Sequence, residues 1–194
     1  MISPPNPLIP HHRPGGGGTL YTIGHSTRSL DDFIALLQAH GIKALADIRA
    51  FPMSRRLPHF NRELLAAALA ANAIEYHWIA ALGGRRKRSL PPDQSPNRAL
   101  RSDSFRNYAD YMLTPGFRAA IDELLAIAVR LPTAYMCAEA VYFRCHRMLV
   151  SDYLVAHGCH VLHIQDLKPP RPHKLTNVAR LCDGVLHYDL GELF

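Results

Sequence analysis

The stretch LYTIGHSTRSLDDFIALLQAHGIKALADIR, residues 20–49, sets the architecture of this chain. It opens with a short run of β-branched and aromatic residues that ends at Gly24, which is typical of a strand. After Ser29, a residue that can cap a helix, apolar residues recur with helical spacing until Gly41. The largely apolar run Ile42–Ile48 then predicts a buried strand. A strand, a helix and a second buried strand in this order predict a right-handed unit with parallel strands.

The rest of the chain repeats this alternation of strands and helices. Further strands are predicted at Ile74–Ile79, Thr133–Met136 and His160–Ile164. Further helices are predicted after a cap at Asn61 and over residues 105–112, 115–129, 146–156 and 175–181. We therefore expect one Rossmann-like, three-layer α/β domain over residues 19–194, with a mostly parallel sheet flanked by helices.

The composition excludes several classes of protein. No apolar run approaches the roughly 18 residues that a membrane helix needs, and no secretory signal opens the chain. We therefore expect a soluble, cytoplasmic protein with four reduced cysteines, none of which forms a Cys-x-x-Cys pair. Five prolines and four consecutive glycines within residues 1–18 predict a disordered tail.

Positive charge is concentrated between the third and fourth predicted strands. The chain has a formal charge of +6, and seven basic against two acidic residues lie within residues 84–106. Three prolines in this segment predict a long basic loop over residues 84–104. The loop suits an anionic partner such as nucleic acid, although it can equally be a solvated loop that keeps the protein soluble. The candidate nucleic-acid contacts are Arg85, Arg86, Lys87 and Arg88.

Polar residues follow four of the predicted strands at the point where each strand ends. Because ligands of parallel α/β sheets bind beyond the carboxyl ends of the strands, we expect these residues to form one site. The residues, in chain order, are Gly24, His25 and Ser26, then Asp47, Arg49 and Ser54, then Gly83, and finally Cys137, Glu139, Cys145, His146 and Arg147.

The segment after the fourth strand carries the candidate nucleophiles, Cys137 and Cys145. The basic residues Arg144, His146 and Arg147 could lower a thiol pKa and hold a phosphate or sulfur oxyanion. Six residues separate Cys137 from Arg144, a longer spacing than phosphatase-type and rhodanese-type loops have, so we do not assign either class. Two alternatives stay open: the cysteines are small core residues, or Cys137, Cys145 and His146 bind a metal.

Four residues are candidates for acid–base or nucleophilic chemistry: His25, Asp47, Cys137 and Glu139. Asp47 and Arg49 point to the same side of a strand and form either a functional pair or a structural ion pair. Gly24 and Gly83 would allow a ligand to approach the backbone closely or take a positive φ. The expected substrate-binding residues are Gly24, Ser26, Arg49, Ser54, Gly83, Cys145, His146 and Arg147.

Four segments carry a resemblance to a known family. They are YTIGHS at 21–26, DIRAFPMS at 47–54, Tyr76 followed by LGG at 82–84, and CAE at 137–139 leading to CHR at 145–147. In this order they resemble the uncharacterised family catalogued as domain of unknown function 488, over about residues 20–164. The resemblance implies a shared α/β domain and one shared site built from these segments. It implies no established activity or cofactor.

Two functions follow from these patterns. The first is an enzyme of unknown reaction that acts on a small anionic or nucleotide-like substrate at the Cys/His/Asp/Arg site beyond the strands. The second is a non-catalytic nucleic-acid-binding or regulatory module that uses the basic loop. The sequence identifies no cofactor and leaves the oligomeric state open.

Overall fold

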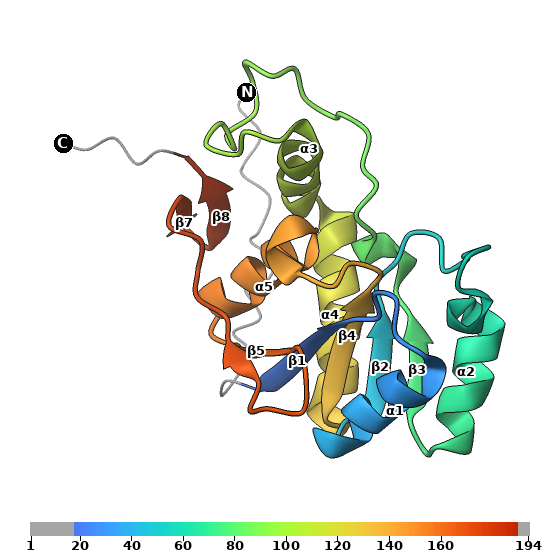
Figure 1. The fold of residues 1–194 in the computed structure, drawn as a ribbon. Coiled ribbons are helices and arrows are strands. Elements are labelled where there is room, and N and C mark those ends of the chain that lie inside the picture. The colour runs from blue at the N-terminus through green and yellow to red at the C-terminus, as the bar shows by residue number, and fades with distance from the viewer. Residues whose placement is uncertain (1–17, 190–194) are drawn as a thin grey trace, which may run out of the picture.

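The computed structural model describes residues 18–189, built around a six-stranded sheet (Figure 1). The disordered tail predicted for residues 1–18 lies, apart from Gly18, outside the described residues. The strands are β1 (Thr19–Gly24), β2 (Ala44–Asp47), β3 (Glu75–Trp78), β4 (Thr133–Cys137), β5 (His160–Ile164) and β6 (Arg171–Pro172). Their order across the sheet is β3-β2-β4-β1-β5-β6. The first five are parallel, and the short β6 pairs antiparallel to β5 at one edge.

Helices cover both faces of this sheet, which confirms the predicted three-layer α/β architecture. The α-helices among the described residues are α1 (Leu30–Ala39), α2 (Arg62–Ala71), α3 (Asp103–Met112), α4 (Pro115–Arg130) and α5 (Arg147–Ala156). Helices α1 and α2 pack on one face, and α4 and α5 pack on the other (Figure 1). Two separate hydrophobic clusters therefore hold the fold together, one on each face of the sheet.

The alternation of side chains along each strand divides the buried residues between the two clusters. In β4, Tyr135 and Cys137 belong to the cluster beneath α4 and α5, whereas Ala134 and Met136 belong to the cluster beneath α1 and α2. Cys137 therefore points toward the α5 side of the sheet.

None of the described helices has the length and apolar character that crossing a bilayer requires.

Local signals explain where α1 begins and ends, whereas the cap predicted for α2 forms a different hydrogen bond. Ser29 caps α1, because its side chain accepts a hydrogen bond from the backbone N of Asp32 at 3.1 Å. Gly41 follows α1 with a φ of +68°, a left-handed conformation that suits glycine. Asn61 stands at the cap position of α2, but its side chain accepts a hydrogen bond from the backbone N of Ser54 instead.

The C-terminal segment differs from the sequence prediction. The helix predicted for residues 175–181 is wrong, because this segment leads into a hairpin of β7 (Ala179–Cys182) and β8 (Val185–Tyr188). Asp183 and Gly184 join the two strands with φ values of +50° and +76°. An Asp-Gly pair with positive φ at both residues is a favoured hairpin turn. The turn therefore explains the hairpin, and the sequence reading missed it.

Candidate functional site

The candidate site lies at the carboxyl end of β4. Strands β1 and β2 flank β4 and lead into helices on one face of the sheet, whereas β4 leads into α5 on the other face. The segments that follow these neighbouring strands therefore diverge, and a ligand crevice is expected there. A cavity of about 590 Å³ is found at this position. Its lining includes Arg49, Phe51, Arg85, Cys137, Glu139, Arg144, Cys145 and His146.

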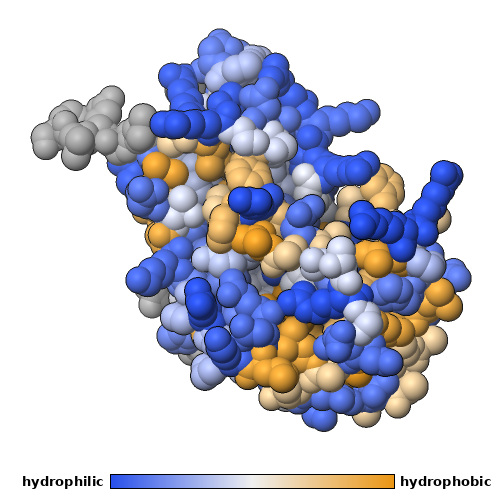
Figure 2. Space-filling model, in the orientation of Figure 1, coloured by the Kyte–Doolittle hydropathy of each residue, from blue (hydrophilic) through white to orange (hydrophobic). Residues whose placement is uncertain are grey.

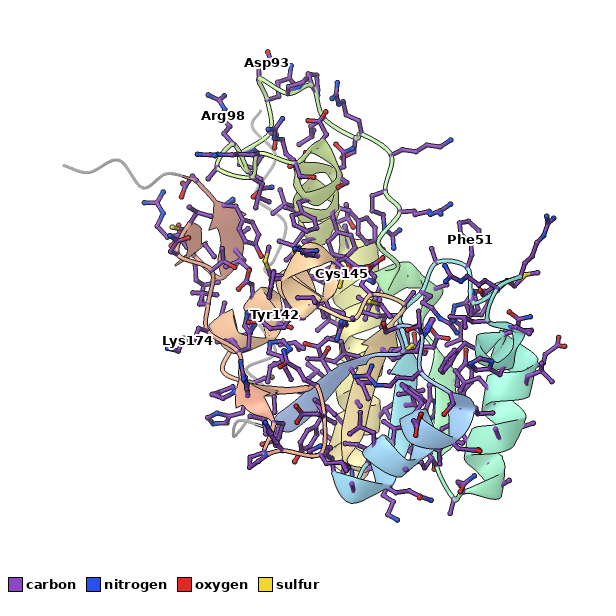
Figure 3. The ribbon with its side chains drawn as sticks, in the orientation of Figure 1. Phe51, Asp93, Arg98, Tyr142, Cys145 and Lys174 are labelled. Atoms are coloured by element: carbon purple, nitrogen blue, oxygen red, sulfur yellow. The ribbon has the colours of Figure 1, made fainter. Side chains whose placement is uncertain are left out.

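Two cysteines lie side by side in the wall of this cavity. The Sγ atoms of Cys137 and Cys145 are 3.4 Å apart. Cys137 is the last residue of β4, and Cys145 comes just before α5, after the short turn η3 (Tyr142–Arg144). The backbone N of Cys145 donates to the Tyr142 carbonyl at 3.2 Å, which closes this turn. Figure 3 shows Cys145 near the start of α5, above the sheet.

Arg147 is the cation next to the cysteine pair and is only 1% exposed. Its Nε donates to Cys137 Sγ at 3.1 Å, and its Nη1 donates to Thr22 Oγ1 at 3.1 Å. Its Nη2 donates to the carbonyls of Glu139 and Ala140. Within residues 18–189, no carboxylate forms an ion pair with Arg147. The positive charge of this buried side chain therefore faces the two sulfurs.

The contact between the two sulfurs shifts the pKa values of the two thiols in opposite directions. The hydrogen bond with Cys137 lowers the pKa of Cys145 to about 6, and the charge of Arg147 acts in the same direction. The same hydrogen bond, together with burial, raises the pKa of Cys137. Cys137 Sγ also accepts a hydrogen bond from the backbone N of Glu139 at 3.3 Å. Because the two thiols are hydrogen-bonded to each other, they titrate as a pair.

Gly24 holds the end of β1 against the segment that carries Cys137. A Cβ atom at position 24 would lie 1.8 Å from the carbonyl oxygen of Glu139. The next two backbone N–H groups, of His25 and Ser26, donate to the carbonyls of Cys137 and Ala138. Gly24 and Ser26 therefore make contacts within the protein framework of the site, and the close approach at Gly24 is to the protein's own backbone.

Asp47, Arg49 and His25 form a connected polar network beside the cavity. Asp47 is fully buried and accepts hydrogen bonds from Arg49 Nε at 2.8 Å and from the Tyr76 hydroxyl at 2.7 Å. Arg49 Nη1 lies 3.3 Å from His25 Nε2. Burial, followed by the charge of Arg49, lowers the pKa of His25 to about 4, so its ring is neutral. His25 Nδ1 then donates to the Ser26 carbonyl, and Nε2 accepts from Arg49.

His146 and Gly84 also line the cavity, and Gly83 comes directly before Gly84. His146 Nε2 donates to the Ile48 carbonyl at 3.1 Å, and burial lowers the pKa of this ring to about 4. A Cβ at Gly84 would lie 2.5 Å from His146 Nδ1, and one at Gly83 would lie 2.7 Å from Ala50. Gly83, like Gly24, has a negative φ and allows the protein itself to pack closely.

Ser54 makes hydrogen bonds within the loop after β2 and to Asn61. Its hydroxyl accepts a hydrogen bond from the backbone N of Leu57 at 3.0 Å, which stabilises the loop after β2. Ser54 does not belong to the lining of the cavity described above. The structure therefore gives Ser54 a role in shaping this loop.

Cys137, Cys145 and His146 also make a possible metal-ligand set. Their candidate ligand atoms all lie within 4.8 Å of one another. Two thiolates and one imidazole are a donor set that zinc accepts, and catalytic zinc sites use three protein ligands. The hydrogen bond from His146 Nε2 to a carbonyl leaves Nδ1 as the free nitrogen, as in many metal-binding histidines.

The four basic residues predicted to contact nucleic acid are divided by the structure. Arg86 donates to the carbonyls of Gly83 and Ala81, and its guanidinium lies 3.7 Å from the centre of the Tyr111 ring. Arg88 pairs with Asp103 at 3.4 Å. Arg85, in contrast, lines the cavity, and Lys87 is exposed. Arg86 therefore holds the loop in place, whereas Arg88 makes an exposed ion pair with the first residue of α3.

Several residues at the candidate site are not predicted by the sequence patterns. Thr22 contacts Arg147 from the middle of β1, and Phe60 stacks on His25 with ring centres 4.1 Å apart. Phe51 and Met53 line the cavity and are exposed. The motif at 47–54 contains both of these apolar residues, but apolar residues in a loop carry no local signal for a ligand site. The contacts of Thr22 and Phe60 join segments that are distant in the sequence.

Comparison with known proteins identifies the family. The sequence pattern described as Domain of unknown function DUF488 matches residues 29–154, more than half of the chain. This span contains Asp47, Arg49, Cys137, Cys145 and Arg147. No curated protein and no solved structure shows a significant match. Three of the four sequence segments, all but YTIGHS at 21–26, lie within the matched residues, and the chain therefore belongs to the family of domain of unknown function 488, as predicted.

Proposed function

We propose that this protein is an enzyme that uses the thiolate of the Cys137–Cys145 pair on a small anionic substrate. The observation that carries this proposal is the environment of Arg147, which is buried, has no carboxylate partner within residues 18–189 and donates to Cys137 Sγ. A buried cation without a counter-ion is strongly unfavourable. A thiolate at this position supplies the missing negative charge, and a stabilised thiolate is a nucleophile.

The charge of the cavity indicates an anionic substrate. Its lining contains Arg85 and Arg144, for which the described residues supply no acidic ion-pair partner, together with Arg49, which is paired with Asp47, and the carboxylate of Glu139. Guanidinium groups bind phosphate and carboxylate through paired hydrogen bonds. The volume of about 590 Å³ lies within the usual range of small-molecule sites.

The two sulfurs can divide a nucleophilic reaction between them, one as the attacking thiolate and the other as the proton donor to the leaving group. The thiolate attacks an electrophilic atom of the substrate, and the leaving group departs with its electron pair and takes the proton of the second thiol. Water then splits the covalent adduct, so that one hydrogen returns to sulfur and the hydroxyl leaves with the product. Glu139 lies at the cavity and can orient this water. Asp47 and His25 act through Arg49, which they hold in position.

Alkylation with iodoacetamide tests the proposal. Because the pKa of Cys145 is about 6, we expect the reaction rate to rise through that pH, well below the usual thiol pKa of about 8.5. Phosphate or sulfate bound by the arginines should slow the reaction. Cys137→Ser and Cys145→Ser should each remove the fast phase, whereas Cys159→Ser should keep it. Thiols that react only after the protein unfolds would show that the pair is part of the core and would overturn the proposal.

A metal centre at Cys137, Cys145 and His146 is the second candidate, because these three ligand atoms lie within 4.8 Å. Titration of the reduced protein with Zn²⁺ separates the two functions. Stoichiometric binding that blocks alkylation and is lost in His146→Gln supports the metal centre. Fast alkylation that excess Zn²⁺ leaves unchanged supports the free thiolate.

A further inference from the structure

Exposed apolar side chains lie at the mouth of the charged cavity. Phe51 is 69% exposed and Met53 is 80% exposed, and both belong to the cavity lining. Phe143, which is 54% exposed, comes directly before Arg144 in the turn η3. Phe51 lies at the outer surface, on the loop after β2 (Figure 3). Large apolar groups exposed beside a polar pocket commonly mark a binding surface.

Basic side chains accompany these apolar residues. The guanidinium of Arg85 lies 5.9 Å from the centre of the Phe51 ring. Arg55, Arg56, Lys87 and Arg144 are also exposed. For none of these five does the described part of the chain supply an acidic ion-pair partner. Figure 2 shows long hydrophilic side chains projecting beside apolar groups on this part of the surface.

We propose that the substrate is a nucleotide within single-stranded nucleic acid that binds across this mouth. This inference rests on the proposed function, because it names the substrate class of the same cavity. Proteins that bind single strands combine a basic surface with aromatic rings on which bases stack. An acidic peptide would use the charges but would give the exposed rings no partner. A duplex would keep its bases stacked on each other and away from Phe51.

The arrangement assigns separate roles to the residues. Phe51 provides the stacking surface for a base, with the Arg85 guanidinium close to the same ring. Arg55, Arg56 and Lys87 neutralise the phosphates outside the cavity. Arg144 holds the phosphate of the nucleotide that enters the cavity. Arg49 lines the cavity but is bound to Asp47, His25 and the Phe60 carbonyl. Arg86 and Arg88 are excluded from these roles, because they bind the protein itself.

Fluorescence anisotropy with a labelled 20-nucleotide single strand and the matching duplex tests the inference. We expect the single strand to bind at least tenfold more tightly than the duplex. Phe51→Ala should weaken binding about tenfold, because stacking contributes roughly 1–3 kcal/mol per base. The double variant Arg85→Gln, Lys87→Gln should lower the slope of log K against log salt by about 1.4, since each phosphate contact on a single strand contributes about 0.7.

Arg130→Gln provides the matched control. Arg130 ends α4 and pairs with Glu75, the first residue of β3. It therefore lies at the amino-terminal end of the strands, whereas the cavity lies at their carboxyl end. This variant should bind the single strand like the unmodified protein. Circular dichroism should show that Phe51→Ala remains folded, because Phe51 is largely exposed.

Several results would overturn the inference. Equal affinity for single strand and duplex, or unchanged binding by Phe51→Ala, would remove the stacking role. Binding of polyglutamate in place of the oligonucleotide would indicate an acidic protein partner. If the thiols react quickly and phosphate protects them while no oligonucleotide binds, this inference fails and the proposed enzyme stands. If the oligonucleotide binds and the thiols are unreactive, the surface stands and the thiolate enzyme fails.

Discussion

The Nε atom of Arg147 lies 3.1 Å from the Sγ atom of Cys137, in a part of the core where both side chains are almost completely buried. Cys137 ends β4, and Arg147 begins α5. The intervening loop therefore folds back, so that its two ends meet. This contact couples the charge of the thiol pair to the stability of the loop, because Arg147 also bonds the carbonyls of Glu139 and Ala140.

Replacing Arg147 by Lys should distinguish the contribution of its charge to the thiol pKa from the contribution of its hydrogen bonds. Lys keeps the charge but lacks the planar fork that reaches Thr22, Cys137 and the Glu139 carbonyl together. We expect the apparent thiol pKa to rise from about 6 to about 7, so that alkylation at pH 6 slows about fivefold. We measure this as the pH profile of iodoacetamide alkylation. Arg130→Lys serves as the control, and an Arg147→Lys profile equal to that of the control would contradict the proposed coupling.

Mild oxidation should join Cys137 and Cys145 in a disulfide. Their sulfurs are 3.4 Å apart and need to approach to about 2.05 Å, a movement that rotation of the side chains and small loop shifts can supply. Treatment with diamide should lower the free thiol content from four to two, with Cys159 and Cys182 unmodified. Peptide mapping without reductant identifies the cross-link. A cross-link through Cys159 or Cys182, or its persistence in Cys145→Ser, would refute the prediction.

Removing the charge of Asp47 should destabilise the fold strongly. Asp47 is the buried partner of Arg49, which is only 7% exposed, so Asp47→Asn leaves a buried guanidinium unpaired. We expect the free energy of unfolding to fall by about 3–5 kcal/mol. Tyr76→Phe removes only one hydrogen bond to the same carboxylate and should lower the free energy of unfolding by about 1.5 kcal/mol. Urea unfolding measures both, and equal losses would show that the ion pair contributes little.

Stability should fall in mild acid because His25 is buried in its neutral form. Burial and the charge of Arg49 lower its pKa from 6.5 to about 4. Between these values the unfolded chain binds more protons than the folded one, so the free energy of unfolding falls as the pH falls from 7 to 5. The contribution of His25 over this interval is about 2 kcal/mol. Urea unfolding at pH 7 and pH 5 should therefore show a fall in the free energy of unfolding that is smaller by this amount in His25→Gln. Because His160 is exposed, His160→Gln should show the same fall as the unmodified protein.

A methyl group at position 24 should disrupt the site. The added Cβ of Gly24→Ala would lie 1.8 Å from the Glu139 carbonyl oxygen and 2.8 Å from Arg147 Nη2. The Cys137 segment would have to move, so we expect a loss of more than about 3 kcal/mol in stability and slower thiol alkylation. Gly116→Ala is the matched control, because its Cβ meets no atom closer than 3.7 Å and the residue lies in α4. That substitution should leave the protein as stable or more stable by about 0.5–1 kcal/mol.

Local patterns were sufficient to predict most of the secondary structure. The period of apolar residues, Ser29 before α1 and glycine after it depend on nearby residues alone, which is why the elements from β1 to β5 agree with the prediction within a few residues. Parallel order of the strands then brings their carboxyl ends to one edge, so the general location of Cys137, Arg49 and Gly24 follows as well. The prediction failed at residues 175–181, where the Asp183-Gly184 turn belongs to a hairpin.

Residue roles depended on contacts between distant segments. The residues Arg85, Arg86, Lys87 and Arg88 look alike in the sequence, yet Arg86 and Arg88 are bound to the protein and Arg85 faces the cavity. The position of Cys137 in β4 predicts an ordinary core side chain. Its sulfur nevertheless accepts a hydrogen bond from Arg147, because α5 packs over the same face of the sheet. Charge pairing and desolvation are set by which side chains meet in three dimensions. Sequence patterns therefore located the candidate site, and the packing of α5 and the loops against the sheet determined which side chains meet there.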